Sequence, residues 1–464
     1  MLGIQIFFIV LLVGLLILHF LKQLWSRRRY PPGPLPLPAI GSIWWTGIRL
    51  YQDILIKSTK QNGNTERPVT PFLKSVKNEK DLVFSNGPIW KQQRQIGQLT
   101  VRKLKARKQG LEHQIQEEAH QLVGTFAHVK GQPLDPLLSI TNSVCNVVCA
   151  VVFGHRYSVE DKNFWKLTEA IDFAFKCGGS FIFTLYEMFP WVMKRLPGPH
   201  KKALSSRDFV LSFAKDEIKK HKEHYSRREP QDFTDFYLLQ MKKVKSKSDL
   251  NSTYNEENLA QCILDLFITG AETTATTLQW ALLLMATHPD IQDKVHKEME
   301  DVLDASHLVC YQDWKKLPFT SAVIHEIQRA KYAFLFRIIR QCAKDVDILR
   351  FLIPKGSFIN PDLHSVLDPK QWKTPEKFNP NNFLDEDGNF VAGEEFLMFG
   401  AVDCGCLEEQ LARMELFIFF TSLLRVFNFQ LPEGVKKFSQ QHRVGLTIYP
   451  HSYKVCAVPR SKAS

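Results

Sequence analysis

An apolar segment near the amino terminus constrains this chain more than any other feature. Residues 2–21 are apolar except at two positions. At about 1.5 Å of rise per residue, a helix of that length crosses the roughly 30 Å hydrocarbon core of a bilayer. Lys22 and the arginines at 27–29 follow the run, whereas a cleavable signal peptide carries its positive charge before it. We therefore expect a single transmembrane anchor at residues 1–22, with the rest of the chain in the cytosol.

A basic, proline-rich stretch follows the anchor. Residues 31–38 read PPGPLPLP, which forms neither a helix nor a central strand. Residues 23–38 are therefore expected to be a stiff hinge. The whole chain has 464 residues and 44% hydrophobic composition. The part behind the hinge can therefore bury a large core, as one domain or as several.

Charge and cysteine content limit the kinds of binding partner and metal site that the chain can have. The chain holds 60 Lys and Arg against 48 Asp and Glu, a net charge of +12, which suits an anionic membrane, an acidic protein or a nucleic acid. No nucleic-acid-binding motif accompanies the charge, so nucleic acid ranks last. Nine cysteines without regular spacing predict free thiols in a cytosolic body. Cys404 and Cys406 alone cannot form a zinc site.

The order of elements predicts a mainly α protein with small β-sheets. Helical periodicity, broken by Pro and Gly, dominates up to residue 318, with long runs at 111–128, 209–224 and 258–287. Short apolar runs with turn signals follow residue 338. A last helix is expected at 408–425, followed by β-like segments.

Cys406 lies where a short loop opens onto this last predicted helix. Free N–H groups and positive partial charge at a helix N-terminus lower the pKa of a cysteine, so Cys406 is a candidate thiolate ligand for iron. The competing interpretation, which applies to any single cysteine, is a buried and inert thiol.

The longest predicted helix carries polar residues at its centre. Gly270 would let a ligand approach the backbone, and Glu272 with Thr273 would form a proton-delivery pair. The alternative is an ordinary buried helix whose threonines bond to the preceding turn.

Two further pairs are weak signals when taken singly. Trp90 and Arg94 are four residues apart, which suits binding of a carboxylate beside a flat apolar group, but a surface Arg over a half-buried Trp is common. Glu326 and Arg329 share one helix face, as many exposed ion pairs do.

Taken in order along one chain, these motifs resemble the cytochrome P450 family. The resemblance covers nearly the whole chain, and further segments look like microsomal family-2 members: 84–87, 186–191, 322–325, 372–380 and 456–460. It implies the mainly α P450 fold as one haem domain at residues 39–464, behind the anchor and the hinge.

The resemblance also implies roles for individual residues. Cys406 would be the axial thiolate ligand of a haem b iron, in a loop that begins at Phe399, a further cofactor-binding residue. Glu272 and Thr273 would relay protons to bound O2. The remaining implied roles are propionate binding (Trp90, Arg94, Arg340), helix locking (Glu326, Arg329) and pocket lining (Phe267, Ala271).

The implied activity is insertion of one oxygen atom from O2 into an apolar small molecule, such as a fatty acid, a steroid or a foreign compound. Electrons would come from the NADPH-dependent cytochrome P450 reductase, whose acidic surface suits a basic protein, with cytochrome b5 as a second candidate donor. The expected location is the endoplasmic reticulum membrane, in contact with its lipid and with the catalytic domain in the cytosol.

The chain departs from the family pattern at the cysteine loop. Val402 and Glu408 replace glycines, and Cys404 replaces an arginine. Glu408 adds bulk and negative charge beside the sulfur, and a carboxylate near a thiolate raises the pKa of the cysteine. A stretch that in the family holds β-strands and a short helix is also shortened near residues 60–71, and Ala330, Leu335 and Ile339 replace the usual Phe and two prolines.

Three interpretations follow. The first is a membrane-anchored haem-thiolate monooxygenase. The second is a P450-like protein that binds haem weakly or not at all, which the altered loop favours. The third, a tethered structural protein without a ligand site, would require the motifs to be coincidences.

Overall fold

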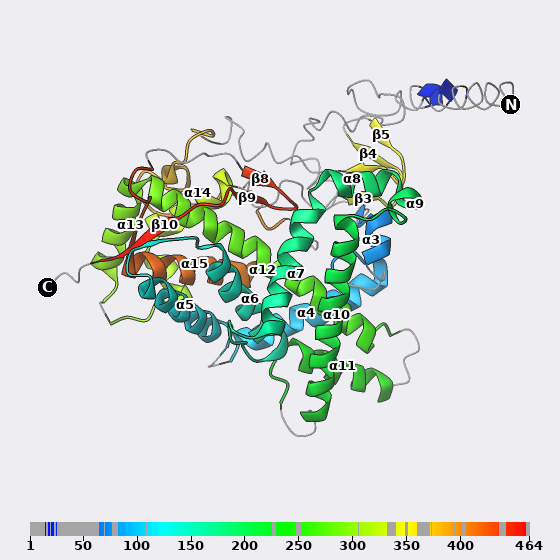
Figure 1. Cartoon of the computed structure of the whole chain (residues 1–464), viewed down its shortest axis with the longest axis horizontal. Helices are drawn as coiled ribbons and strands as arrows, with labels where there is room; N and C mark the ends of the chain where they lie inside the picture. Colours follow the sequence, from blue (N-terminus) through cyan, green and yellow to red (C-terminus); the bar gives the residue numbers. More distant parts are fainter. Residues whose placement is uncertain are drawn as a thin grey trace. The chain divides into compact units, whose positions relative to one another are not determined.

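Figure 1 shows the computed structural model of the chain. The structure describes seven residues between 14 and 25, and residues 65–460 apart from 69, 77–81, 108–109, 225–228, 247–251, 305, 332–339, 349–350, 360–371, 373, 394–395, 397, 401–404 and 436–441. Within this described part, no helix combines the length and the apolar character that a membrane span needs. The predicted anchor and hinge lie almost entirely outside the described residues, as do Val402, Cys404, Leu335 and Ile339.

The chain divides into two compact units. The smaller unit contains residues 1–68 and 336–365. Its described part holds an antiparallel sheet in the order β1 (Thr65–Glu66), β3 (Arg340–Cys342) and β6 (Phe358–Ile359), and a hairpin of β4 (Val346–Ile348) and β5 (Phe351–Ile353). Thr65 pairs with Cys342, so the strand next to the shortened stretch does find a partner.

The larger unit, residues 69–335 and 366–464, is mainly helical. The resemblance predicted this class, a mainly α fold with small sheets, and the structure has it. The helices are α3 (Pro71–Val76), α4 (Gly87–Lys105), α5 (Leu111–His128), α6 (Leu137–Phe153), α7 (Lys162–Gly178), α8 (Phe181–Met188), α9 (Pro190–Met193), α10 (Pro199–His224), α11 (Phe233–Ser246), α12 (Glu256–Thr287), α13 (Pro289–Val302), α14 (Pro318–Ala330) and α15 (Glu409–Val426), with 3-10 turns η2 (Tyr311–Lys316) and η4 (Pro380–Phe383).

The helix α12 is the centre of this unit. It packs against α6, α10 and α15 (Figure 1), and 25 of its 32 residues are buried. Its start is well defined, because the Asn255 side chain accepts a hydrogen bond from the Asn258 N–H at 2.8 Å and two acidic residues fill the first turn. It ends at Thr287, two residues before Pro289, which cannot continue the helical hydrogen bonding.

Two small sheets complete the larger unit. One has the order β2 (Pro133–Leu134), β10 (Val455–Pro459) and β7 (Phe427–Gln430), all antiparallel. The other is a hairpin of β8 (His442–Val444) and β9 (Ile448–Pro450). The indole N–H of Trp280, in α12, donates to the carbonyl of Ile448 at 2.9 Å, which ties the hairpin to the central helix.

The predicted helical runs agree closely with the observed ones. The run 111–128 coincides with α5, and 408–425 differs from α15 by one residue at each end. The run 209–224 is the second half of α10, which begins ten residues earlier at Pro199, a residue well suited to a first helical turn.

The N-cap of α12 gives a stability prediction. Replacing Asn255 by Ala leaves an N–H of the first turn without its acceptor and should lower the free energy of unfolding by about 1 kcal/mol, whereas Asn255→Gly should cost only a few tenths. Urea unfolding of both variants followed by circular dichroism tests this. An unchanged free energy of unfolding in Asn255→Ala would show that the cap does not stabilise α12.

Candidate functional site

Glu326 and Arg329 form a fully buried ion pair in α14. The guanidinium donates to both carboxylate oxygens at 2.7 Å, and both side chains have no exposed surface. Arg329 also donates to the carbonyls of Pro375 and Lys377, and Glu326 accepts the Asn379 N–H at 2.8 Å. The pair therefore fastens α14 to the irregular segment 374–382, with its charges satisfied.

Trp90 and Arg94 lie in α4 and reach the cysteine loop. The Arg94 guanidinium is 5.5 Å from the centre of the Trp90 ring, within cation–π range. One of its N–H groups donates to the Gly405 carbonyl at 2.8 Å, directly before Cys406 in the chain. Arg94 is thus brought to the loop that carries the candidate metal ligand, with Trp90 beside it.

The loop between Phe399 and Cys406 is closed by a backbone hydrogen bond. The Cys406 N–H donates to the Phe399 carbonyl at 2.7 Å, and Gly400 adopts a φ of 84°, a left-handed conformation that favours glycine. The Arg413 guanidinium lies 4.8 Å from the Phe399 ring centre and holds the start of the loop against α15. These contacts fix both ends of the loop.

Cys406 is accessible but in crowded surroundings. Solvent reaches its side chain. The protein atoms around it nevertheless desolvate the thiolate, and together with the nearby Glu408 carboxyl they raise the pKa of the thiol to about 12. The group is therefore a neutral thiol at physiological pH when no cation is bound. A coordinated metal ion reverses this, because it deprotonates the thiol that binds it.

The acid and the hydroxyl of α12 point to different partners. Glu272 is buried, which with the nearby Asp172 raises the pKa of its carboxyl to about 8, and Oε1 accepts a hydrogen bond from Thr276 at 3.3 Å. Thr273 is partly exposed, and its hydroxyl donates to the Thr269 carbonyl at 2.8 Å. The threonines thus do bond to the preceding turn, as the alternative interpretation of this helix predicted.

Glu408 makes the contact that sequence reasoning missed. Its side chain is 8% exposed, and Oε2 lies 2.6 Å from the Thr269 hydroxyl of α12. The same hydroxyl bonds to the Asp265 carbonyl at 2.8 Å. A hydroxyl has one hydrogen to donate, so the Glu408 carboxyl supplies the second. Burial raises the pKa of Glu408 to about 8, which agrees with a protonated carboxyl.

Gly270 is the reason that Glu408 fits. A Cβ placed on Gly270 would lie 3.0 Å from Glu408 Oε1 and 3.1 Å from Val148 Cγ2, so a larger residue would force one of them to move.

A second acidic side chain, that of Glu415 in α15, also hydrogen-bonds a threonine of α12. Glu415 is 1% exposed, and burial raises its pKa well above the usual value although Thr274 hydrogen-bonds it. Two carboxyls therefore reach from the α15 side to threonines of α12.

The residues predicted to line a pocket are buried instead of accessible. Phe267 has no exposed surface and its ring centre lies 5.7 Å from that of Phe153, and Ala271 is 1% exposed. The partly exposed residues of this stretch of α12 are Ile268, Thr269 and Thr273. Arg340 belongs to β3 of the smaller unit and pairs with Ile359 there.

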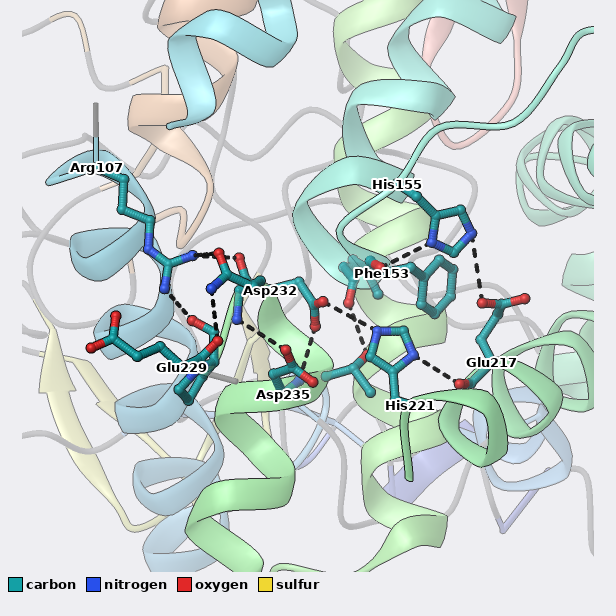
Figure 2. Close-up of polar contacts among 12 residues, drawn as sticks. Arg107, Phe153, His155, Glu217, His221, Glu229, Asp232 and Asp235 are labelled. Atoms are coloured by element: carbon teal, nitrogen blue, oxygen red, sulfur yellow. Dashed lines mark hydrogen bonds and ion pairs between the residues drawn. The ribbon is translucent and has the colours of Figure 1, made fainter. Parts of the chain in front are cut away.

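A separate polar cluster joins α10 to the start of α11 (Figure 2). His221 bonds through Nδ1 to the Glu217 carbonyl at 2.8 Å and through Nε2 to Asp232 at 3.1 Å. Burial alone would lower the pKa of His221, but the hydrogen bond and charge of Asp232 outweigh it and raise the pKa to about 9. With His221 and Asp232, Asp235 forms a set of three side chains whose ligand atoms are close enough together to hold a metal ion. A doubly protonated ring has no lone pair to offer, so we interpret the cluster as a buried ion pair.

Comparisons with known proteins agree with this architecture. The family model described as Cytochrome P450 matches residues 31–457. Cytochrome P450 2J5 of Mus musculus is 37% identical, over 93% of this chain and 92% of the relative. Cytochrome P450 2J2 of Homo sapiens is 38% identical, over 95% and 87%, and Cytochrome P450 2D20 of Mesocricetus auratus 34%, over 98% of each chain.

The chain belongs to the cytochrome P450 family. It is therefore an oxidoreductase of the P450 monooxygenase class, and the cofactor of its family is haem. Its similarity to family-2 members extends over nearly the whole chain.

The buried ion pair gives a second stability prediction. Arg329→Ala leaves the Glu326 carboxylate buried without its counter-charge and should lower the free energy of unfolding by about 3–5 kcal/mol. Lys215→Ala, which breaks the half-exposed pair with Glu257, should cost less than about 1 kcal/mol. Denaturant unfolding of the two variants measures both. Similar losses would contradict the assigned difference between a buried and an exposed pair.

His221 gives a pH prediction. Its pKa is raised in the folded state, so the stabilisation is complete below the unfolded pKa of about 6.5 and is lost as the pH rises through about 9. We expect the free energy of unfolding to fall over this range, by at most about 2 kcal/mol because solvent screens part of the interaction. His221→Gln should remove that decrease. An unchanged slope in the variant, measured by urea unfolding between pH 6 and 9.5, would disprove the assignment.

Proposed function

We propose that the protein is a haem-thiolate monooxygenase that inserts one oxygen atom of O2 into an apolar small molecule, such as a fatty acid, a steroid or a foreign compound. The observation that carries the proposal is the position of Cys406: an accessible thiol at the start of α15, on a loop closed onto Phe399 and held by Arg94. The donor set suits haem, since a thiol at this place becomes a thiolate ligand once iron binds.

Bound haem b would supply thiolate-ligated iron at which O2 is activated. Cys406 would hold the iron through Sγ. Trp90 and Arg94, already stacked beside the loop, and Arg340 would bind the propionates. Glu326 and Arg329 would keep α14 and the segment 374–382 in place around the site.

The proton supply would rest on α12. With a pKa of about 8, the Glu272 carboxyl holds a proton at neutral pH, so it can act as a donor. The partly exposed Thr273 hydroxyl is the neighbouring group that would pass the proton on, after it exchanges its bond to the Thr269 carbonyl for one to the substrate side. Phe267 and Ala271 remain our candidates for contact with substrate, provided that the pocket opens towards them.

The cellular setting follows from the sequence. Residues 1–22 would anchor the protein in the endoplasmic reticulum membrane by a single span, with residues 23–38 as the hinge and 39–464 as the cytosolic haem domain. Electrons would come from NADPH-cytochrome P450 reductase or from cytochrome b5, and the net charge of +12 suits an acidic donor surface.

The contact of Glu408 with Thr269 favours a second candidate, a P450-like protein that binds haem weakly or not at all and is impaired in catalysis. It shares the fold and the anchor with the first. The two differ in whether the Cys406 thiolate ligates iron.

A spectrum separates the two candidates. The reduced, carbon-monoxide difference spectrum of the full-length protein in membranes should show the band of a thiolate-ligated haem. Cys406→Ser should abolish that band. Cys404→Ser is the control, because it removes the nearest other cysteine in the sequence, and it should keep the band. No band in the unaltered protein would favour the impaired protein, and a band that survives Cys406→Ser would exclude Cys406 as the ligand.

A further inference from the structure

The Glu408 side chain connects the cysteine loop to α12, two parts of the site that bound haem would separate in the proposed function. Glu408 follows Cys406 by two residues and caps the start of α15, on the thiol side of the site. Its carboxyl ends against Thr269 at 2.6 Å and against the bare backbone of Gly270 in α12. Glu272 and Thr273, which would serve bound O2, lie on this same stretch of α12.

In the proposed function, Cys406 would ligate the iron and residues of α12 would serve the bound O2, so the haem macrocycle would lie between the cysteine loop and α12. Any side chain that runs directly from the loop to α12 therefore crosses the layer that the macrocycle would occupy. The Glu408 side chain runs in this way from the loop to α12. Its carboxyl reaches the Thr269 hydroxyl at a hydrogen-bond distance of 2.6 Å.

The crossing is well supported by its surroundings. Glu408 is buried, Val148 lies beside the same Cβ position of Gly270 as the carboxyl, and the Thr269 hydroxyl is oriented by its bond to the Asp265 carbonyl. A buried carboxyl that leaves such a contact gives up a buried hydrogen bond. The contact thus stabilises the haem-free protein.

We propose that the Glu408 side chain competes with haem for the space between the Cys406 loop and α12, so that haem binds only after Glu408 leaves Thr269. This inference rests on the proposed function and adds to it that haem affinity is set by Glu408. In the haem-free protein, the Glu408 side chain then occupies this space.

The test measures haem binding and haem-free stability in the full-length protein. Haem-free protein in detergent is titrated with haem and followed by absorbance, for the unaltered chain and for Glu408→Gly. The variant should bind haem at least about tenfold more tightly, since one buried hydrogen bond no longer has to be broken. Its haem-free form should melt at a lower temperature than the unaltered protein.

Two variants control for charge and for chain flexibility. Glu408→Gln keeps the size and the hydrogen bond and should resemble the unaltered protein. Gln410→Gly introduces a glycine at an exposed position of the same helical turn and should leave haem affinity unchanged. Thr269→Val removes the partner and should tighten haem binding. If Glu408→Gly gives no cooperative melting transition, Glu408→Ala and Thr269→Val decide.

The outcomes separate this inference from the proposed function. If the unaltered protein and Glu408→Gly bind haem equally tightly, each with a thiolate-type spectrum, the competition is disproved and the proposed function stands. If neither binds haem, the proposed function fails and Glu408 is not the obstacle. Tighter binding in Glu408→Gly and Thr269→Val, together with a lower melting temperature of the haem-free forms, supports the competition.

Discussion

The burial of α12 is the constraint on which the larger unit depends. A helix that is enclosed over nearly its whole length must find a partner for each polar side chain it carries, since an unpaired polar group in an apolar environment is costly. The threonines of α12 meet this requirement with backbone carbonyls and with acids from the α15 side. The surrounding helices and the β8–β9 hairpin are positioned by the same central element.

Three buried acids, on α12 and on the α15 side, determine the polarity of the site. Glu272, Glu408 and Glu415 all have raised pKa values because they are buried. A row of neutral carboxyls tolerates an apolar ligand nearby better than a row of carboxylates would, because no buried negative charge needs a counter-ion. The departure of the cysteine loop from its family therefore changes the interior of the protein and not only the loop.

Much of the fold could be predicted from the sequence, for local reasons. The periodicity of α5 and α15 is regular, and Pro and Gly mark their surroundings, so their bounds were predicted within one residue. The ion pair of Glu326 and Arg329 was likewise visible, since the two residues share a helix face, although its complete burial depends on residues about fifty positions away.

Contacts between distant segments could not be predicted in this way. Glu408 and Thr269 are 139 residues apart, and nothing in either local pattern names the other as a partner. The direction of Phe267 was also open, because helical periodicity in a helix that is apolar on all sides does not say which face meets a ligand. For Cys406, a helix N-terminus predicts a low pKa, but crowding by neighbouring atoms and Glu408 outweighs it.

The order of the β2, β10 and β7 sheet has a consequence for synthesis of the chain. Its central strand is β10, whose residue Val455 pairs with Leu134, more than 300 residues earlier. At about 5–20 residues per second, the ribosome needs roughly 15–60 s to make the intervening chain. During that time β2 has no partner strand in this sheet, because β7 is made only shortly before β10, and the helices made so far must pack without the sheet. The nascent protein thus depends on its helical packing until the last strand is made.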